Sequence, residues 1–131
     1  MIVLEIPTEK RVDFQSISVK IQSTILKEGW QDGILAIYAP HTTCGITINE
    51  NADPDVVRDV TMEMNKVIPF EDSYRHMEGN AAAHIKTSLF GSSETVIVED
   101  GRMILGTWQG VFLVDFDGPR RRKVYLKFIS S

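Results

Sequence analysis

Three histidines are the residues of this chain best suited to chemistry at neutral pH: His41, His76 and His84. A neutral imidazole binds a divalent metal or moves a proton, and three histidines with one open position form a common catalytic zinc site. His41 leaves an apolar segment at a turn, His76 lies in a polar stretch, and His84 lies in an expected helix. Their spacing matches no short metal-binding motif, so three separate surface histidines are the competing interpretation.

Carboxylate groups gather between Glu50 and Asp55. Such groups hold Mg²⁺ beside substrate phosphates or act as general acid and base. Asp53 precedes Pro54, so it is equally well explained as a helix cap, and Asp55 suits a first helical turn. Glu50 ends an apolar strand and would need a partner if it were buried. Glu50 and Asp53 are therefore the candidate catalytic carboxylates.

Other side chains have the chemistry to contact a ligand. Thr42 and Thr43 offer hydroxyl groups, although adjacent threonines are also common in turns. Trp108 lies in a glycine-containing link and suits either stacking on a planar ring or plain packing. Arg120 opens a basic run over 120–123 and suits the binding of one phosphate. Because alternate residues of a strand point to opposite faces, this run does not form a DNA-binding patch.

Three helices are expected to position these residues. The first has isoleucines at every fourth position and ends at Gly29, and the second begins at Asp53-Pro54 and ends before Pro69. The third is capped by Asn80 and ends at Gly91. Their expected apolar stripes are Ile17, Ile21 and Ile25; Val56, Val60 and Met64; and Ala81, Ile85 and Leu89.

The rest of the chain has the patterns of strands and turns. Asp100-Gly101 between two apolar runs is a strong hairpin signal. Segment 111–114 is apolar on both faces and is expected to be a central strand. We expect 34–39 and 45–49 to pair with each other through the turn at 41–43. The expected strands are 2–6, 34–39, 45–49, 96–99, 103–105, 111–114 and 124–128, so the pattern predicts an α+β fold.

Length and composition limit the class of protein. The 131 residues suit one domain, and they exclude a two-domain enzyme or an eight-fold barrel. With 43% hydrophobic and 24% charged residues, the chain is an ordinary globular protein, and its net charge of −4 argues against a nucleic-acid binder. The longest apolar stretch, 34–39, is too short to cross a membrane. We expect no signal peptide, because the first residues lack a basic segment and their apolar run breaks at Glu5. The single Cys44 cannot form an internal disulfide, which fits a cytoplasmic location.

Several of these segments occur together in an order that resembles the YjbQ-like family, small proteins often described as secondary thiamine-phosphate synthases. The resemblance covers nearly the whole chain, as one domain over 1–131. Each motif alone is weak, and the ordered set is specific. It consists of His41-Thr42-Thr43, Asn49 to Asp55, His76, Glu78-Gly79-Asn80, Ala83-His84, Gly106 to Gln109 and Asp117 to Arg120.

The resemblance implies a compact mixed or antiparallel β-sandwich with about three helices, assembled as a homotrimer. It implies that His41, His76 and His84 converge near subunit interfaces and bind a divalent metal, zinc or magnesium. It further implies a weak thiamine-phosphate synthase activity, which joins a pyrimidine diphosphate to a thiazole phosphate and releases pyrophosphate. The expected partner is thus a small phosphorylated molecule.

The same resemblance suggests roles for the other candidate residues. Glu50 or Asp53, with the metal, would neutralise the departing pyrophosphate, and His76 would shuttle a proton unless it binds the metal. The expected substrate-binding residues are Thr42, Thr43, Asn51, Asn80, Trp108 and Arg120. Two alternatives stay open on the sequence alone: a metal-dependent hydrolase, and a trimer that binds a metabolite or a metal without turnover.

Overall fold

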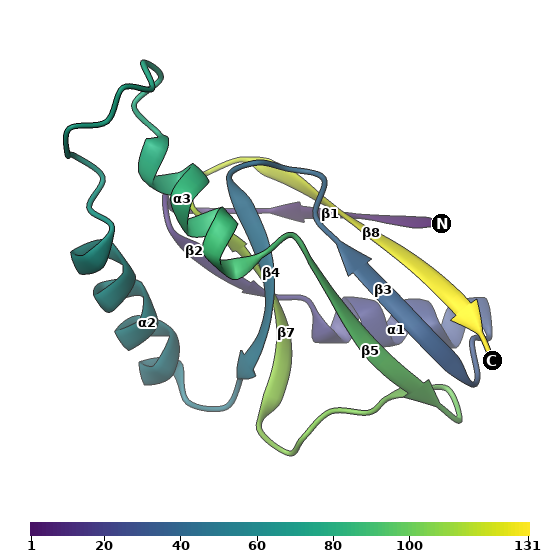
Figure 1. The fold of residues 1–131 in the computed structure, drawn as a ribbon. Coiled ribbons are helices and arrows are strands. Elements are labelled where there is room, and N and C mark those ends of the chain that lie inside the picture. The colour runs from purple at the N-terminus through teal and green to yellow at the C-terminus, as the bar shows by residue number, and fades with distance from the viewer.

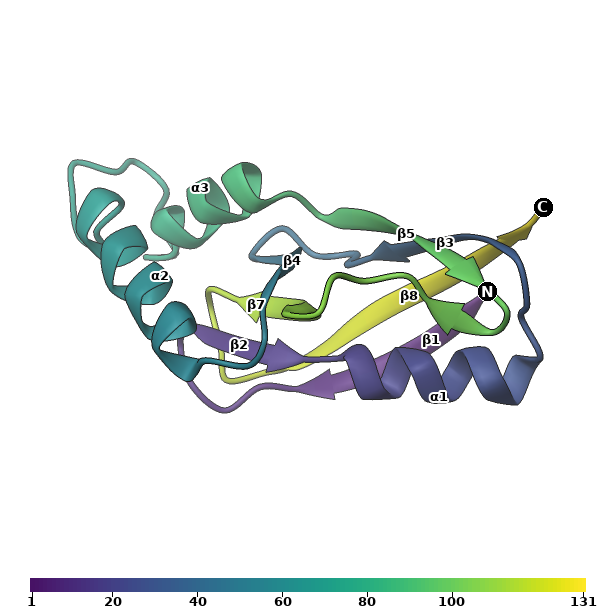
Figure 2. The same cartoon turned by 90° about the horizontal axis from the view of Figure 1, so that it is seen from below.

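The computed structural model describes all of residues 1–131 and has three helices and eight strands (Figure 1). Both chain termini lie at one end of the molecule, and α2 lies at the other (Figures 1 and 2). In chain order the elements are β1 (Ile2–Pro7), β2 (Asp13–Ser16), α1 (Ser18–Glu28), β3 (Gly33–Tyr38), β4 (Cys44–Glu50), α2 (Pro54–Val67), α3 (Ala81–Phe90), β5 (Ser93–Glu99), β6 (Arg102–Met103), β7 (Gln109–Asp115) and β8 (Arg121–Ser130).

The strands form two antiparallel sheets. The larger sheet has the order β1-β8-β3-β5-β6, and the smaller sheet has the order β2-β7-β4. Every strand pair is antiparallel. The α+β class and the packed-sheet architecture expected from the sequence are therefore confirmed.

The main core lies between the two sheets. Leu35 and Ile37 of the larger sheet meet Ile46 and Leu113 of the smaller one, all fully buried. Helix α1 adds its isoleucine stripe to this core, as its spacing predicted, and it ends at Gly29 with a left-handed φ of 69°. One continuous apolar interior thus fixes the positions of both sheets and of α1.

A second, smaller core covers the opposite face of the small sheet. Ala83 of α3 packs there with Phe112, Val114 and Phe116. Gly45 lets β4 approach α3 closely, because a Cβ atom at this position would lie 2.7 Å from the Gly91 carbonyl oxygen. The small side chains of α3 therefore permit close helix–sheet packing.

The expected apolar stripe of α3 is wrong in part. Ile85 and Leu89 are 40% and 68% exposed, and the buried residues are Ala82, Ala83, Lys86 and Thr87. The helix turns its alanines toward the sheet because small side chains allow the close approach to β4, and it buries Lys86 against Phe70 and Asn65. The hydrophobic spacing of so short a helix did not identify its buried face.

The expected pairing of 34–39 with 45–49 is also wrong. Strand β3 pairs with β5 and β8 in the large sheet, whereas β4 pairs with β7 in the small one. The segment between them crosses from one sheet to the other, and the Ala39 amide donates to Ser92 while the Phe116 amide donates to Thr43. The four-residue edge strand β2 was not predicted at all.

Local turn and cap signals were more reliable. Asp100 and Gly101 have φ angles of 51° and 74°, as a two-residue hairpin turn requires, and they connect β5 to β6. Asp53 caps α2 by accepting a hydrogen bond from the Asp55 amide at 2.9 Å. None of the helices combines the length and the apolar character needed to cross a membrane.

Candidate functional site

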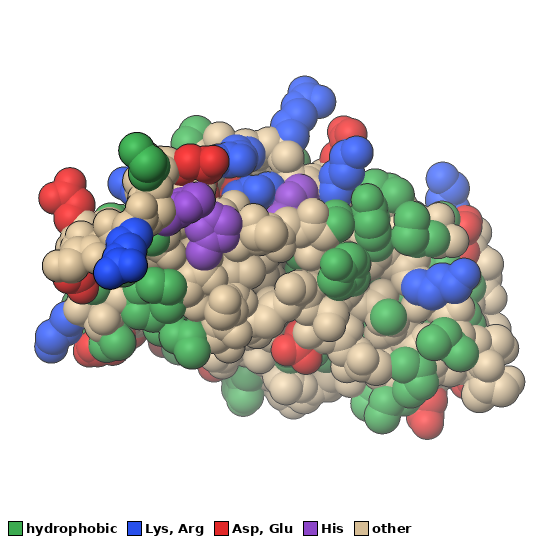
Figure 3. All heavy atoms as spheres, turned by 45° about the horizontal axis from the view of Figure 1, so that its top comes forward, with side chains coloured by type: hydrophobic (Ala, Val, Ile, Leu, Met, Phe, Trp, Pro, Cys, Tyr) green, Lys and Arg blue, Asp and Glu red, His purple; other side chains and the backbone are tan.

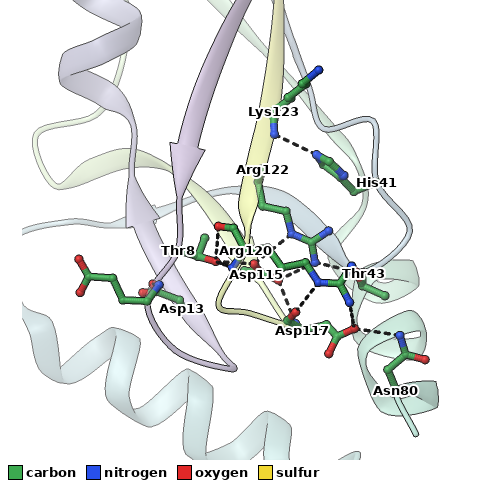
Figure 4. Close-up of polar contacts among 11 residues, drawn as sticks. Thr8, Asp13, His41, Thr43, Asn80, Asp115, Asp117, Arg120, Arg122 and Lys123 are labelled. Atoms are coloured by element: carbon green, nitrogen blue, oxygen red, sulfur yellow. Dashed lines mark hydrogen bonds and ion pairs between the residues drawn. The ribbon is translucent and has the colours of Figure 1, made fainter. Parts of the chain in front are cut away.

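The crossover between the sheets and the β7–β8 turn lie side by side (Figure 4). The crossover supplies His41 and Thr43, and the turn supplies Arg120 with Arg122 just after it. Helix α3 adds residues spaced by four and then three positions, Asn80, His84 and Thr87, which lie on one face of a helix. Three separate segments therefore place polar side chains around the same surface.

A buried ion pair forms the base of this site. The Arg122 guanidinium donates from Nε and Nη2 to the two oxygens of Asp115, at 3.0 and 2.7 Å, and from Nη2 to the Thr43 hydroxyl at 2.7 Å. Thr8 donates to Asp115 at 2.7 Å. The Arg122 and Asp115 side chains are 4% and 0% exposed. The guanidinium is thus held in one orientation by a fully engaged carboxylate.

Both members of this pair are charged in the fold. Burial by itself would raise the pKa of Asp115, but hydrogen bonds from Arg122, Thr8 and the Asp117 amide outweigh it, so the pKa is lowered. Burial would likewise lower the pKa of Arg122, and the hydrogen bonds to Asp115 raise it instead. A charged guanidinium therefore lies beneath the site together with its counter-ion Asp115, and the pair has no net charge.

Asp117 holds a second arginine and the start of α3. Its carboxylate Oδ2 accepts from Arg120 Nη2 at 2.8 Å and from Asn80 Nδ2 at 2.9 Å. The Asp117 carbonyl accepts from Arg120 Nε at 3.0 Å. Asn80 therefore uses its side chain to tie α3 to the turn and does not cap the helix with it. Each arginine is thus positioned by its own carboxylate, Asp115 at the end of β7 for Arg122 and Asp117 in the following turn for Arg120.

His41 is oriented by the backbone of β8. Its Nε2 accepts a hydrogen bond from the Lys123 amide at 2.9 Å, so the neutral ring carries its proton on Nδ1. Burial lowers the pKa of His41 below 6.5, and the positive charge of Arg122 lowers it further. At neutral pH His41 is a neutral ring with one N–H to offer a ligand.

The other two histidines touch each other. The rings of His76 and His84 meet edge to face with centroids 5.1 Å apart, and His76 Nε2 lies 3.8 Å from Glu78 Oε2. Histidine side chains show on one face of the molecule beside Lys and Arg side chains (Figure 3). Folding thus places His84 between His76 and the surface shared with His41.

These groups surround a recess that we call the histidine pocket. It encloses about 510 Å³, and its lining is almost entirely polar. A second recess of about 370 Å³, which we call the hydroxyl pocket, adjoins it and shares His41, Thr42 and His84. The histidine pocket is lined by Tyr38, Pro40, His41, Thr42, Thr43, Glu78, Asn80, His84, Arg120 and Arg122. The hydroxyl pocket is lined by His41, Thr42, His84, Thr87, Ser88, Gly91 and Ser92.

The geometry of one chain does not fit a three-histidine metal centre. A metal binds a free ring lone pair, and the Lys123 amide already engages Nε2 of His41. No group of three His, Cys, Asp or Glu side chains is arranged to hold an ion. His76 and His84 alone have neighbouring rings. The zinc or magnesium ion implied by the resemblance would therefore need a rearranged His41 or ligands from another molecule.

The candidate carboxylates lie at the opposite end of the small sheet. Strand β4 begins at Cys44 beside the histidine pocket and ends at Glu50, seven residues or roughly 20 Å away. Glu50, Asn51 and Asp53 line a different recess of about 580 Å³ beneath α2, which we call the α2 pocket. Within one chain they cannot act on the same substrate atom as His41.

Local structure accounts for these carboxylates. Glu50 is half-buried, and its Oε2 accepts from the Ala52 amide at 3.0 Å, while Asp53 caps α2. Trp108 is 64% exposed and its carbonyl accepts from the Asn51 amide, so it lies at this same end. The tryptophan faces neither the histidine pocket nor a packed core.

Cys44 is a buried hydrophobic residue. Its side chain is fully buried, and desolvation raises its pKa to about 12, so the thiol stays protonated at neutral pH. It has no nucleophilic role in this conformation.

Sequence reasoning missed Arg122 and Asp115, and it noted Asp117 only as part of a family motif. A usable signal was present, because Arg122 points to the same face of β8 as the buried residues Val124 and Leu126. A charge on the buried face of a strand requires a buried partner. The partner itself could not be identified from spacing, since it lies on the neighbouring side of a turn.

The fold and the site together define the class of this protein. The family described as UPF0047 protein YjbQ-like matches residues 2–131. The chain therefore belongs to the YjbQ-like UPF0047 family, as its motifs indicated.

Individual relatives cover almost the whole chain. The chain is 51% identical to UPF0047 protein MJ1081 of Methanocaldococcus jannaschii over 127 residues, covering 97% of this chain and 92% of the relative. It is 50% identical to YugU of Bacillus subtilis over 128 residues, covering 97% of both. A crystal structure of a YjbQ/UPF0047 protein from Clostridium acetobutylicum is 47% identical, with a TM-score of 0.96, and covers 98% of this chain and 100% of that one.

Proposed function

We propose that this protein binds a phosphorylated small molecule in the histidine pocket and acts on it as an enzyme. The observation that carries the proposal is the pair of arginines, Arg120 and Arg122, which are each held by a carboxylate and line one recess with two histidines. Guanidinium groups bind phosphate oxygens in a fixed geometry, and imidazoles move protons at neutral pH.

The residues suggest a division of labour. Arg120 and Arg122 would neutralise the negative charge of a phosphoryl group, and the Nδ1–H of His41 would donate to one of its oxygens. His84 would give a proton to a departing oxygen, or take one from an attacking group, with His76 beside it. His76 would in this case act as the proton shuttle rather than as a metal ligand.

The reaction implied by the resemblance, thiamine-phosphate synthesis, fits part of this geometry. A departing pyrophosphate matches the two arginines, whereas Glu50, Asp53 and Trp108 lie too far away in the same chain to help. A hydrolase needs only the histidine pocket and water, so it is the second candidate function. A binding protein without turnover is the third.

The first experiment measures the binding of inorganic phosphate and pyrophosphate by isothermal titration calorimetry. We expect Arg120→Gln and Arg122→Lys to weaken binding, since the first removes a charge and the second loses the fork-shaped donor set. Arg121→Gln is the matched control, because Arg121 is exposed outside the pocket. Equal affinity in all four proteins would refute the assignment of the pocket.

Turnover separates the three functions. His84→Ala should keep the fold and lose the activity, whether this is thiamine-phosphate formation or phosphate release from an ester panel. Unchanged turnover in the purified variant would exclude His84 as the proton-transfer group. Binding without any turnover would favour the non-catalytic candidate.

We also propose that the chain assembles as a homotrimer and that the contact includes α2. None of the fourteen residues of this amphipathic helix is buried, and Met62 and Val67 are 57% and 68% exposed. Exposed apolar side chains of this size are often covered at an interface. Such assembly could bring Glu50 or Asp53 of one copy toward the histidines of another.

Binding of a divalent metal ion by the protein is proposed and tested separately. Elemental analysis of protein purified without a histidine tag, repeated on His41→Ala, measures it directly. A stoichiometric ion that is lost in the variant would establish a metal centre that the single-chain geometry does not form.

A further inference from the structure

The histidine pocket and the hydroxyl pocket adjoin along a shared wall made by His41, Thr42 and His84. A ligand held in one pocket can therefore extend past the histidines into the other. We infer that the ligand is a phosphorylated polyol, with its phosphate in the histidine pocket and its hydroxyl groups in the hydroxyl pocket. This inference rests on the proposed function and names its substrate class.

The two pockets differ in charge. Arg120, Arg122 and Glu78 line only the histidine pocket, so a charged group belongs there. Apart from the shared residues, the hydroxyl pocket has Thr87, Ser88 and Ser92 around Gly91, with no Asp, Glu, Lys or Arg. A ligand that is anionic at one end and uncharged at the other matches this arrangement.

The hydroxyl pocket is polar rather than apolar. No hydrophobic side chain lines it. Apart from the imidazoles of His41 and His84 on the shared wall, a flat aromatic heterocycle would find no ring there on which to stack, and Trp108 lies at the far end of the small sheet. Neutral hydrogen-bonding groups suit this lining better, because serine and threonine hydroxyls both donate and accept.

Helix α3 also carries unused hydrogen-bonding capacity on this side. Only two buried side-chain polar atoms of the protein lack a hydrogen-bond partner, and they are Asn80 Oδ1 and Thr87 Oγ1. Both residues line these pockets and lie on the α3 face that carries His84. Buried polar atoms without partners are rare in folded proteins and often mark a place where a ligand or water completes the network. Small side-chain movements would bring these oxygens to ligand hydroxyls.

The test compares four probes by calorimetry on the full chain. Ribose 5-phosphate combines phosphate with several hydroxyl groups, ethyl phosphate has only an alkyl chain, phenyl phosphate has a flat ring, and ribose has no charge. We expect ribose 5-phosphate to bind at least about tenfold more tightly than ethyl or phenyl phosphate, since two or more additional hydrogen bonds are available. Ribose alone should not bind measurably.

Two variants locate the hydroxyl contacts. Thr87→Val removes the hydroxyl group and keeps the side-chain shape. Ser92→Ala removes a hydroxyl group at a half-buried position just after α3, and it replaces the first variant if that one fails to fold. Each should weaken ribose 5-phosphate binding about three- to tenfold and leave ethyl phosphate unchanged. Thr24→Val on α1, far from the pockets, is the matched control and should change neither.

The outcomes distinguish this inference from the proposed function. Ethyl or phenyl phosphate binding as tightly as ribose 5-phosphate would overturn the polyol inference and leave the phosphate site intact. The inference would also be overturned if Thr87→Val and Ser92→Ala weakened the binding of ribose 5-phosphate and of ethyl phosphate equally. If no phosphorylated probe bound the wild-type chain, the proposed function itself would fail.

Discussion

At the scale of single residues, the site depends on charges that are fixed before any ligand arrives. Arg122 is held by Asp115 and Thr43 in a buried network, and His41 is held by the Lys123 amide. Such preorganisation avoids the cost of orienting long side chains during binding. The substitutions that test these residues therefore affect stability as well as binding.

Replacing Asp115 by Asn leaves the Arg122 guanidinium buried without its counter-charge. We expect the free energy of unfolding to fall by about 3–5 kcal/mol, as when one partner of a buried pair is removed. Urea denaturation monitored by circular dichroism measures the change. Glu5→Gln, in the exposed pair with Arg121 at 4.0 Å, is the control and should cost under about 1 kcal/mol. Equal effects in the two variants would contradict this role of Asp115.

His41 makes stability depend on pH. Burial lowers its pKa in the fold below 6.5, so as the pH falls the unfolded chain binds this proton at a higher pH than the folded chain does. The stabilising effect of a neutral His41 is present above about pH 6.5 and is lost as the pH falls through the lower pKa of the folded state. His41→Gln keeps an acceptor for Lys123 and should lose less stability from about pH 7 to about pH 5. Parallel unfolding curves for both proteins would argue against this effect.

At the scale of elements, the loop before α3 is held by two cationic side chains that contact the Phe70 ring. The Arg11 guanidinium lies 3.8 Å and Lys86 Nζ 4.1 Å from the centroid of Phe70, and Lys86 also donates to Asn65. The same loop places the His76 ring against the His84 ring of α3. Its position therefore depends on contacts with α2, α3 and the segment before β2.

Lys86 gives this element a distinct response to alkali. Burial, and then Arg11, lower its pKa from 10.5 to about 8. Between about pH 8 and pH 10.5 the unfolded chain binds this proton and the folded chain does not, so the free energy of unfolding rises with pH, by ~3 kcal/mol. Lys86→Met should remove this rise, and Lys20→Met, at an exposed position of α1, should keep it. The measurement is urea denaturation from about pH 7.5 to pH 10.5, and a rise retained in Lys86→Met would contradict the assignment.

At the scale of the whole molecule, the two sets of candidate residues lie at opposite ends of the small sheet. The histidines and arginines are at one end, while Glu50, Asn51, Asp53 and Trp108 are at the other. Helix α2 borders the second set (Figure 1), and its Met62 and Val67 side chains are exposed. Contact between copies is the arrangement that would unite the two sets.

Analytical ultracentrifugation tests this assembly. We expect the wild-type chain to sediment at about three times the mass of one chain, and Met62→Glu on α2 to shift it toward the monomer, because a charge would be buried in the contact. Leu26→Glu, at a 68% exposed position of α1, is the matched control and should leave the mass unchanged. A monomeric wild-type protein would refute the proposed trimer.

The sequence by itself determined the elements whose signals are local. The Ile17–Ile21–Ile25 spacing, the Asp53-Pro54 helix start and the Asp100-Gly101 turn each depend on neighbours within a few residues, and the structure confirms all three. The family motifs likewise identified His41, His84 and Arg120, which the fold gathers around one pocket.

Only the tertiary structure decided which segments meet. The transfer of the chain from one sheet to the other at Pro40–Thr43, the Arg122–Asp115 pair and the separation of Glu50 from the histidines all depend on contacts between residues distant in sequence. Strand patterns specify which face is buried but not which partner covers it. Long-range packing of the two sheets settles that choice, and it thereby determines which polar side chains share a pocket.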